Sequence, residues 1–400
     1  MSTVGVITEY NPFHTGHAFQ LRQIRKRMGP DTAVVCAMSG NWVQRGECAV
    51  ADKWLRASWA LAGGADLVLE IPTLWAAAPA ERFAQGGVEV LAASGVVDAL
   101  AFGSESGDGE GLSRLAACLD SREYAAGLRD FLDEGLPFAA CRQAAAERLL
   151  GREAGRLLSQ PNDNLGVEYL RALGRLRQPW PVLALPRVGP AHDSGGTVRG
   201  FRSASALREL LREGRAEQAQ PWLPSGWPAG LEPASLAWAE RAVLARLWSM
   251  EAEDWARLPD SGAGEGLPFR LAAAAREAGS LTDFLTRAKT RRYSHARLRR
   301  LALWAFLGLE EGDRPASVPY LRVLGAGPRG RELLRDMRHR AGLPVVVRPS
   351  GVRRLGETAR RVFALEARCT DWYGLCLPRM PARGREWREG LVLEGQDSGQ

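Results

Sequence analysis

Two histidines near the N-terminus have the spacing of a phosphate-binding turn. His14 and His17 form the pattern HxGH with Gly16, shortly after an apolar, β-branched run over residues 3–8. A helix that begins at such a turn directs free backbone N–H groups and the positive end of its dipole at an anion over the strand. Both rings fall on one face of the first helical turn and can donate hydrogen bonds to phosphate oxygens during attack at the α-phosphorus. The pattern therefore predicts an ATP site with His14 and His17 as catalytic residues.

Two of the five histidines in the chain fall within this motif. A helix cap or a packed core residue would be the preferred interpretation of a single histidine, but it explains a pair at this spacing less well. A later helix start, Ser203-Ala-Ser-Ala-Leu-Arg208, could add Ser205 and Arg208 to the phosphate site. Its hydroxyls would serve equally well as N-caps, so both interpretations stay open there.

Alternating strands and helices must position the histidine pair. Apolar runs predict strands at residues 3–8, 32–38, 66–71, 98–103 and 182–186, and helical patterns lie at 17–28, 51–63, 80–94 and 164–176. This alternation predicts the α/β class, with a Rossmann-like doubly wound parallel sheet whose ligand site lies beyond the carboxyl ends of the strands. A Pro-, Gly- and Trp-rich stretch at 220–233 resembles a linker. We therefore expect a nucleotidyltransferase-like domain over 1–219 and a mainly α-helical C-terminal domain over 220–400.

The composition is that of a globular protein with a basic balance. The chain has 400 residues, 46% of them hydrophobic and 25% charged, and a formal net charge of +7. No apolar run approaches the roughly 18 residues that span a bilayer, so we expect a cytoplasmic protein without a membrane segment. The six cysteines form no CxxC pair, which argues against a zinc site and a disulfide framework. The charge favours a nucleic-acid partner, while the oligomeric state stays open.

The HxGH turn resembles that of the nucleotidyltransferase and class I aminoacyl-tRNA synthetase superfamily, which implies attack on the α-phosphate of ATP and release of pyrophosphate. Further segments are similar to the tRNA(Met) cytidine acetate ligase family, among them MSGNWVQRGE at 38–47, DKWLR at 52–56, GADLVLEIP at 64–72, FGSE at 102–105, His192 with Asp193, and TDWY at 370–373. This resemblance implies that acetate is activated as acetyl-adenylate by residues 1–219. The acetyl group would then pass to N4 of the wobble cytidine of elongator tRNA(Met), which residues 220–400 would contact.

The resemblance also implies which residues hold ATP. By motif these are Ile7, Thr8, Glu9, Tyr10, Asn11, Pro12, Phe13, His14, Thr15, Gly16, His17, Ala18, Phe19, Gln20, Gly103, Asn162, Arg187 and Val188. Without the family, Gly103 could be a simple turn glycine and Asn162 a helix N-cap. Mg²⁺ is expected to accompany ATP, although no protein ligand for it can be named.

The segment 40–47 follows the second expected strand and should overhang the pocket. We expect Asn41, Gln44 or Arg45 to orient acetate or to stabilise the leaving pyrophosphate, with Arg45 as the catalytic candidate. A charged loop is more often simply solvated, so that alternative stays open. The chain departs from the family pattern at Asp163 and Asn164, where more apolar residues are usual, and at Ala191.

A basic segment in the second half is the candidate for tRNA contact. Residues 286–300 (TRAKTRRYSHARLRR) carry seven Lys and Arg and no acid. Arg291, Arg292 and Arg297 are the candidates for phosphate contacts, and Tyr293 could stack on an unpaired base. The alternative is a solvated helix face.

The sequence Gly325-Ala-Gly-Pro-Arg-Gly330 is a literal GxGxxG, which would suit a dinucleotide enzyme. The next strand-like run, at 345–347, ends at Arg348 rather than at an acid, and Pro328 stiffens the loop. We therefore prefer a structural turn at this position.

Two other functions stay open. A small-molecule nucleotidyltransferase would transfer AMP to a phosphorylated metabolite and would need no long basic helical domain. An RNA-binding protein with an inactive pocket would not need the intact histidine pair. Incubation with ATP, labelled acetate and tRNA separates the three, because only the ligase puts label into cytidine.

Overall fold

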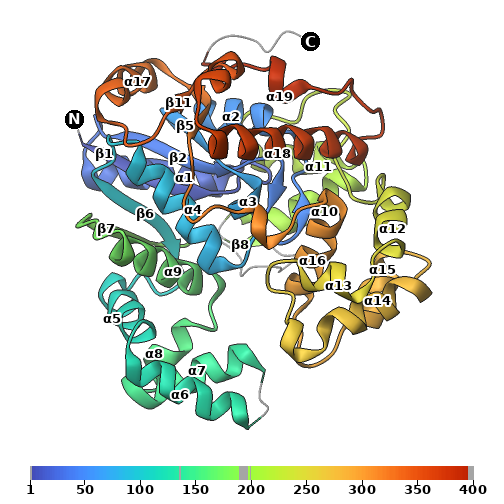
Figure 1. The fold of residues 1–400 in the computed structure, drawn as a ribbon. Coiled ribbons are helices and arrows are strands. Elements are labelled where there is room, and N and C mark those ends of the chain that lie inside the picture. The colour runs from blue at the N-terminus through green and yellow to red at the C-terminus, as the bar shows by residue number, and fades with distance from the viewer. Residues whose placement is uncertain (1, 135–136, 189–196, 199, 395–400) are drawn as a thin grey trace.

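The computed structural model describes residues 2–134, 137–188, 197–198 and 200–394. Its centre is an eight-stranded sheet (Figure 1), in the order β11 (Val345–Val346), β10 (Leu321–Ala326), β5 (Leu67–Ile71), β2 (Ala33–Ser39), β1 (Thr3–Thr8), β6 (Ala99–Ser104) and β7 (Val182–Pro186), with β12 (Val392–Leu393) paired to β10. The strands from β5 to β7 in this order run parallel and coincide with the five expected from the sequence. The Rossmann-like arrangement is therefore confirmed.

Helices cover both faces of the parallel strands, because alternate residues of a buried strand point to opposite sides. On one side, α4 (Ala80–Ala93) and α9 (Pro161–Arg175) pack with Ile7 and Phe102 in one core. On the other side, α1 (Thr15–Met28), α2 (Lys53–Ala62) and α10 (Ala204–Arg212) enclose a second core that includes Val6 and Cys36. The sheet is doubly wound, as expected. Helices α1 and α9 begin two and three residues earlier than the sequence pattern indicated.

The remaining elements form three groups (Figure 1). Between β6 and α9 the chain makes a helical excursion of α5 (Gly109–Leu119), α6 (Arg122–Asp133), α7 (Phe138–Leu150) and α8 (Arg152–Leu157). A lobe on the other side holds α12 (Glu240–Trp248), α13 (Ala252–Ala256), α14 (Leu267–Glu277), α15 (Leu281–Ala288) and α16 (His295–Leu307). Near the β10 edge of the sheet lie α17 (Pro328–Arg340), α18 (Glu357–Tyr373) and α19 (Arg385–Arg388). Among the described residues, no helix is long and apolar enough to cross a membrane.

Short elements connect these groups. They are the helices α3 (Thr73–Ala76) and α11 (Ala216–Ala219), the hairpin strands β3 (Trp42–Val43) with β4 (Glu47–Cys48) and β8 (Thr197–Val198) with β9 (Phe201–Arg202), and the 3₁₀ turns η1 (Gln220–Trp222), η2 (Ala263–Glu265), η3 (Glu311–Asp313), η4 (Pro349–Arg354) and η5 (Gly374–Cys376).

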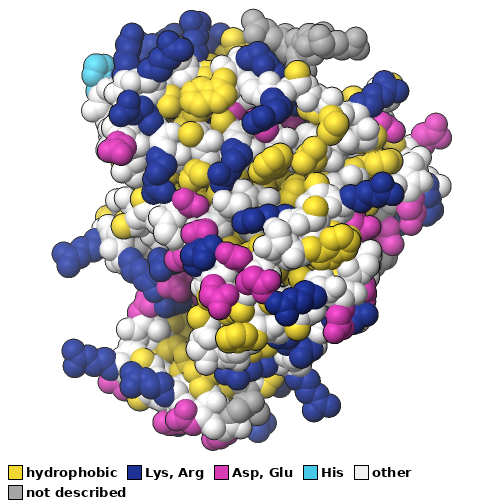
Figure 2. Space-filling view, turned by 45° about the vertical axis from the view of Figure 1, so that its right-hand side comes forward, with side chains coloured by type: hydrophobic (Ala, Val, Ile, Leu, Met, Phe, Trp, Pro, Cys, Tyr) yellow, Lys and Arg dark blue, Asp and Glu magenta, His cyan; other side chains and the backbone are white. Residues whose placement is uncertain are grey.

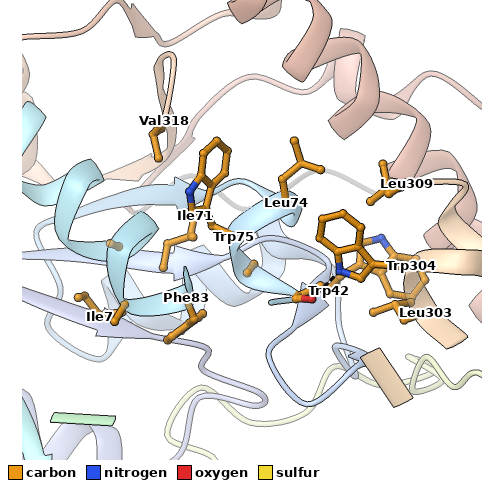
Figure 3. Packing of buried hydrophobic residues seen from close by; sticks show 14 of the residues in the cluster. Ile7, Trp42, Ile71, Leu74, Trp75, Phe83, Leu303, Trp304, Leu309 and Val318 are labelled. Atoms are coloured by element: carbon orange, nitrogen blue, oxygen red, sulfur yellow. Dashed lines mark hydrogen bonds between the residues drawn. The ribbon is translucent and has the colours of Figure 1, made fainter. Parts of the chain in front are cut away.

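The second half of the chain is mainly helical, but it also extends the sheet of the first half. Strand β10 pairs antiparallel with β5, and β11 and β12 pair with β10. Side chains of α16 complete the same core: Figure 3 shows Trp304 beside Leu74 and Trp42, and the Trp304 Nε1–H donates to the carbonyl of Ala77 at 2.6 Å. The boundary between 219 and 220 remains a prediction, since the two halves share one sheet and one core.

The glycine-rich turn between β10 and α17 faces away from the expected nucleotide site. Because β10 runs antiparallel to β5, this turn lies at the end of the sheet opposite the carboxyl ends of the parallel strands. The Gly327 N–H donates to the carbonyl of Asp66 at 2.9 Å, and a Cβ at Gly330 would lie 1.9 Å from the same oxygen. Close packing on the Asp66 backbone explains these glycines, which supports the structural interpretation of the motif.

Candidate active site

A cavity of about 360 Å³ opens at the carboxyl ends of β1 and β6, where the order of the strands reverses. Open α/β sheets bind their ligands at such a position. The walls come from the HxGH turn, the β3–β4 hairpin, and the starts of α9 and α10. The lining residues are Ile7, Thr8, Glu9, Tyr10, Asn11, His14, His17, Gln20, Val43, Gln44, Arg45, Glu47, Ala80, Phe83, Phe102, Gly103, Pro161, Asn162, Asn164, Leu165, Tyr169, Arg187, Ser203, Ala204 and Arg208.

The two histidines form a stacked pair at the start of α1. Their ring centroids lie 3.8 Å apart with an interplanar angle of 27°. His14 is the N-cap of the helix: its Nδ1 accepts from the Gly16 N–H at 3.0 Å, and the His17 Nδ1 accepts from the His14 N–H at 3.3 Å. Because both Nδ1 atoms act as acceptors, the proton of each neutral ring sits on Nε2. The cap interpretation and the phosphate-donor interpretation are therefore compatible.

Burial and positive neighbours keep this pair uncharged. Burial, with the charges of Arg187 and Arg208, lowers the pKa of His14 to about 3. Burial and the adjacent His14 likewise lower the pKa of His17 well below its usual value. In the form without ligand the rings thus present two neutral Nε2–H donors, and the negative charge of a phosphate would strengthen such contacts.

The fold brings together three positions that the family resemblance had marked separately. A Cβ at Gly103, near the end of β6, would lie 3.3 Å from Cγ of Arg187, so a larger residue would crowd this wall. Arg187 Nη1 donates to Asn162 Oδ1 at 3.1 Å, and Asn162 Nδ2 donates to Glu105 at 2.5 Å. Asn162 is not the N-cap of α9, which is Gln160, so the alternative interpretation of Asn162 as a cap is wrong.

The departure from the family pattern at Asp163 has a structural explanation. Asp163 is fully buried, where an unpaired carboxylate would be costly. It accepts hydrogen bonds from the Ser104 hydroxyl and from the backbone N–H groups of Glu105 and Ser106, both at 3.0 Å. In return, the Glu105 carboxylate accepts from the backbone N–H of Asp163 at 2.9 Å. These bonds join the end of β6 to the start of α9 and so fix two walls of the pocket.

The β3–β4 hairpin supplies Gln44 and Arg45 to the pocket, but not Asn41. The Gln44 N–H donates to Glu9 Oε1 at 2.8 Å. Burial raises the pKa of Glu9, against this hydrogen bond and the charges of Arg208 and Arg45. Asn41 is fully buried outside the pocket lining, where its Oδ1 accepts from the Lys53 N–H at 2.9 Å. The expectation that Asn41 orients acetate is therefore not supported, whereas Gln44 and Arg45 stay candidates.

At the start of α10, the structure separates the two residues that had been considered together. Arg208 lines the pocket and donates from Nη1 to the carbonyl of Asn11 at 2.9 Å. Ser203 is the N-cap of the helix, accepting from the Ala206 N–H at 3.2 Å. The Ser205 hydroxyl lies 3.2 Å from that of Ser203 and does not line the pocket. Arg208 thus remains the better candidate for phosphate contact.

Other residues of the expected ATP set lie around the main pocket. Gly16, Phe19 and Val188 line a neighbouring cavity of about 80 Å³ that shares both histidines. Pro12, Phe13, Thr15 and Ala18 line neither cavity, and Phe13 is buried in the core. His192 and Asp193, which also belonged to the family pattern, lie outside the described residues.

The role of Arg56 was not predicted from the sequence, although the DKWLR motif contains this residue. Arg56 is fully buried on α2 and donates to four backbone carbonyls. These belong to Glu9 at 2.5 Å, Ser39 at 3.1 Å, Ala51 at 2.9 Å and Gly40. Arg56 therefore ties together the chain segments that leave β1 and β2, which position the HxGH turn and the hairpin.

The basic segment before and within α16 is only partly available for RNA. Arg291 and Arg292 are exposed, although Arg292 Nε lies 3.8 Å from Glu265. Arg297 is half-buried and pairs with Asp260 at 3.2 Å and Glu265 at 3.5 Å. Tyr293 is buried and donates to the carbonyl of Glu265 at 3.2 Å, so the expectation that it stacks on a base is wrong. Figure 2 shows Lys and Arg side chains spread over the visible face among acidic ones.

Comparison with known proteins finds similarity over nearly the whole chain. The model of the family described as HIGH Nucleotidyl Transferase matches residues 1–386. The tRNA(Met) cytidine acetate ligase of Acetivibrio thermocellus is 31% identical over 98% of this chain and 100% of its own length, and that of Thermotoga maritima is 36% identical over 94% and 96%. A crystal structure of Thermotoga maritima TmcAL bound with alpha-thio ATP is 32% identical, covers 98% of this chain and 100% of its own, and has a TM-score of 0.90; an apo form gives 0.92.

Proposed function

The chain belongs to the tRNA(Met) cytidine acetate ligase family, and from this we propose how its residues carry out the reaction of that family. The enzyme activates acetate with ATP and transfers the acetyl group to N4 of the wobble cytidine of elongator tRNA(Met). The assignment of residues depends mainly on the stacked pair of His14 and His17. Their Nε2–H donors line the cavity at the switch point of the sheet.

In the first half-reaction, a carboxylate oxygen of acetate attacks the α-phosphorus of ATP and the bond to pyrophosphate breaks. Negative charge gathers on the phosphate oxygens, where prearranged donors stabilise the transition state more than the ground state. His14 and His17 supply two such donors. Arg45, Arg187 and Arg208 add positive charge around the same cavity. Acetyl-adenylate and pyrophosphate are the products.

The nucleotide itself would occupy the wall formed by β6 and α9. Gly103 allows close approach of the ligand to the backbone, and Asn162 and Arg187 offer an amide and a guanidinium at the same edge. We expect Mg²⁺ to arrive with the ATP phosphates. The described residues contain no cluster of three or more His, Cys, Asp or Glu suited to a metal, and no step of this mechanism is assigned to the ion.

In the second half-reaction, N4 of the cytidine attacks the carbonyl carbon of acetyl-adenylate and AMP leaves. Contact with tRNA is assigned to the second half of the chain, where Arg291 and Arg292 are exposed. Arg297 contributes less, because Asp260 and Glu265 already neutralise its charge.

Incubation of the protein with ATP, carbon-labelled acetate and tRNA(Met) tests the function directly. The expected result is incorporation of acetyl label into cytidine of the tRNA. In a parallel incubation with labelled pyrophosphate, label should pass into ATP only when acetate is present. Label in a small-molecule adenylate product without acetylated cytidine would support the nucleotidyltransferase alternative instead. Absence of both exchange and incorporation would support an RNA-binding protein with an inactive pocket.

A further inference from the structure

A second cavity lies behind the β3–β4 hairpin, next to the nucleotide pocket. Its volume is about 160 Å³, and it is enclosed by residues 46–48 and by helices α12, α15 and α16. Most of its wall is apolar, with Leu236, Leu281 and Leu285 only half-buried around it. An apolar cavity of roughly 150 Å³ can hold one benzene ring, so the space suits a single flat ring rather than a whole nucleotide.

Glu47 lines both cavities. Its two carboxylate oxygens face different arginines: Oε1 lies 3.4 Å from Arg299 on α16, and Oε2 lies 3.4 Å from Arg212 on α10. Both arginines also line the second cavity. The carboxylate is therefore held in one orientation between the place where acetyl-adenylate forms and a ring-sized apolar space.

The neighbouring glycine keeps this arrangement close-packed. Gly46 has a φ of +77°, a conformation that other residues rarely adopt. A Cβ there would lie 2.6 Å from the backbone nitrogen of Arg300 and 2.7 Å from the carbonyl carbon of Arg299. The hairpin thus rests directly on α16, which fixes Glu47 relative to the wall of the second cavity.

We propose that the second cavity receives the pyrimidine base of the acceptor nucleotide, and that Glu47 is the catalytic base for acetyl transfer. This inference rests on the proposed function. A base that leaves its stack needs an apolar slot for its ring and an acceptor for its exocyclic amine, and a carboxylate is the acceptor that matches the amino group of cytosine. Arg212 and Arg299 supply positive charge for the flanking phosphates.

The N4 lone pair of cytidine forms a bond to the carbonyl carbon of acetyl-adenylate, and the bond from that carbon to the AMP oxygen breaks. The proton lost from N4 passes to the Glu47 carboxylate and then to solvent, and AMP leaves as the anion. The amine of cytosine is a weak nucleophile because its lone pair is delocalised into the ring. Removal of its proton as the new bond forms therefore lowers the barrier.

The substitution Glu47→Gln tests the role of the carboxylate, because glutamine keeps an acceptor oxygen and loses the basicity. The variant should keep the wild-type melting temperature, and acetate-dependent pyrophosphate exchange should be reduced far less than acetyl transfer. Single-turnover transfer from preformed acetyl-adenylate to tRNA should fall by about 10²-fold or more, the usual contribution of a general base. Glu47→Asp, which keeps a basic carboxylate, should retain more of this transfer than Glu47→Gln. Glu123→Gln, an exposed change of the same charge on α6, should alter neither reaction.

Several outcomes would overturn the proposal. Unchanged transfer, or equal losses in Glu47→Gln and Glu47→Asp, would mean that Glu47 only holds Arg212 and Arg299 in place. Loss of pyrophosphate exchange in Glu47→Gln would place Glu47 in the first half-reaction. If the wild-type protein itself shows no exchange, the proposed function fails and not this inference alone.

Filling the second cavity tests its occupant independently. Leu285→Trp should close the space from its half-buried wall. Acetyl transfer to tRNA should be lost or its KM for tRNA strongly raised, while pyrophosphate exchange stays near the wild-type rate. Leu132→Trp on α6, at an exposed position remote from both cavities, is the matched control. Normal transfer in Leu285→Trp would refute the assignment of the base to this cavity.

Discussion

Replacing Glu70 by glutamine should remove a pH dependence of stability that a buried charge cluster creates. Lys53 is fully buried, with its Nζ 2.6 Å from Glu70, 2.5 Å from Glu386 and 4.0 Å from Glu366. Arg322, also buried, lies 3.3 Å from Glu386. Two cations face three carboxyl groups, so full ionisation would leave one uncompensated negative charge in the core. Such a charge is costly, and the cluster avoids it by keeping a proton.

Glu70 is the carboxyl that best holds this proton. Burial raises its pKa to about 8, helped by the carboxylates of Glu366 and Glu386 and opposed by Lys53. Burial also raises the pKa of Glu366, whereas Lys53 and Arg322 lower the pKa of Glu386 despite its burial. The folded pKa of Glu70 thus exceeds the ordinary value of 4.5 in the unfolded chain. The contribution of Glu70 to stability is fully present at a pH below 4.5 and is lost as the pH rises through 8.

The magnitude follows from proton linkage. One proton that is bound in the folded state and absent from the unfolded state changes the free energy of unfolding by about 1.4 kcal/mol per pH unit. From roughly pH 5.5 to 7.5 the wild type should therefore lose about 2.5 kcal/mol relative to Glu70→Gln. In the variant, the two remaining carboxylates match the two cations without a retained proton. Groups elsewhere in the protein affect both forms equally, so the difference between them isolates the cluster.

Urea denaturation of both proteins at several pH values measures this difference. The free energy of unfolding of the variant should rise relative to that of the wild type as the pH rises, whatever baseline stability is lost with the hydrogen bond from Lys53 to Glu70. Glu217→Gln, at an exposed site on α11, should track the wild type. Parallel curves for the wild type and Glu70→Gln would show that no proton is retained and would refute the reasoning.

Three further predictions concern the proposed reaction. His17→Ala should slow acetate-dependent pyrophosphate exchange by about 10²- to 10³-fold with little change in circular dichroism, because one prearranged donor is lost; an exchange rate like that of the wild type would contradict the phosphate role. Gly46→Ala should impair pyrophosphate exchange and acetyl transfer together and lower the melting temperature, because the new Cβ would meet the backbone of α16. Normal activity with unchanged stability would show that the hairpin does not rest on this contact. The double substitution Arg291→Gln and Arg292→Gln should weaken tRNA binding and reduce the slope of log Kd against log salt concentration by about 2, whereas pyrophosphate exchange stays normal. An unchanged slope would show that tRNA binds to another surface.

The sequence predicts the parallel sheet and the histidine pair well because both depend on local patterns. The five parallel strands are short apolar runs, and HxGH is contained within four residues. The expectation that Asn41 orients acetate was not supported, because the groups that surround this residue lie far away along the chain. Its partners are the Lys53 N–H and the Thr370 hydroxyl, which lie 12 and 329 residues away along the chain. A polar residue in a loop gives no local sign that distant groups will enclose it.

The same dependence on residues that are distant in the sequence explains the wrong predictions for the second half of the chain. Residues 286–300 contain no acid, yet Asp260 and Glu265 neutralise Arg297, and the Glu265 backbone binds Tyr293. Strands β11 and β12 have two residues each, too short for a periodic pattern to reveal. Only the family resemblance marked Gly103, Asn162 and Arg187, and their contacts arise from three separate segments of the fold.

The hairpin between β3 and β4 depends on both halves of the chain. The first half holds it through the Gln44 N–H on Glu9 and through Arg56, which binds the Gly40 carbonyl. The second half holds it from the other side: Trp42 Nε1–H donates to the carbonyl of Cys369 at 3.0 Å, and α16 packs on Gly46. The hairpin carries Arg45 into the nucleotide pocket and Glu47 to its border with the second cavity. A shift of α16 relative to the sheet would therefore move side chains that line the nucleotide pocket.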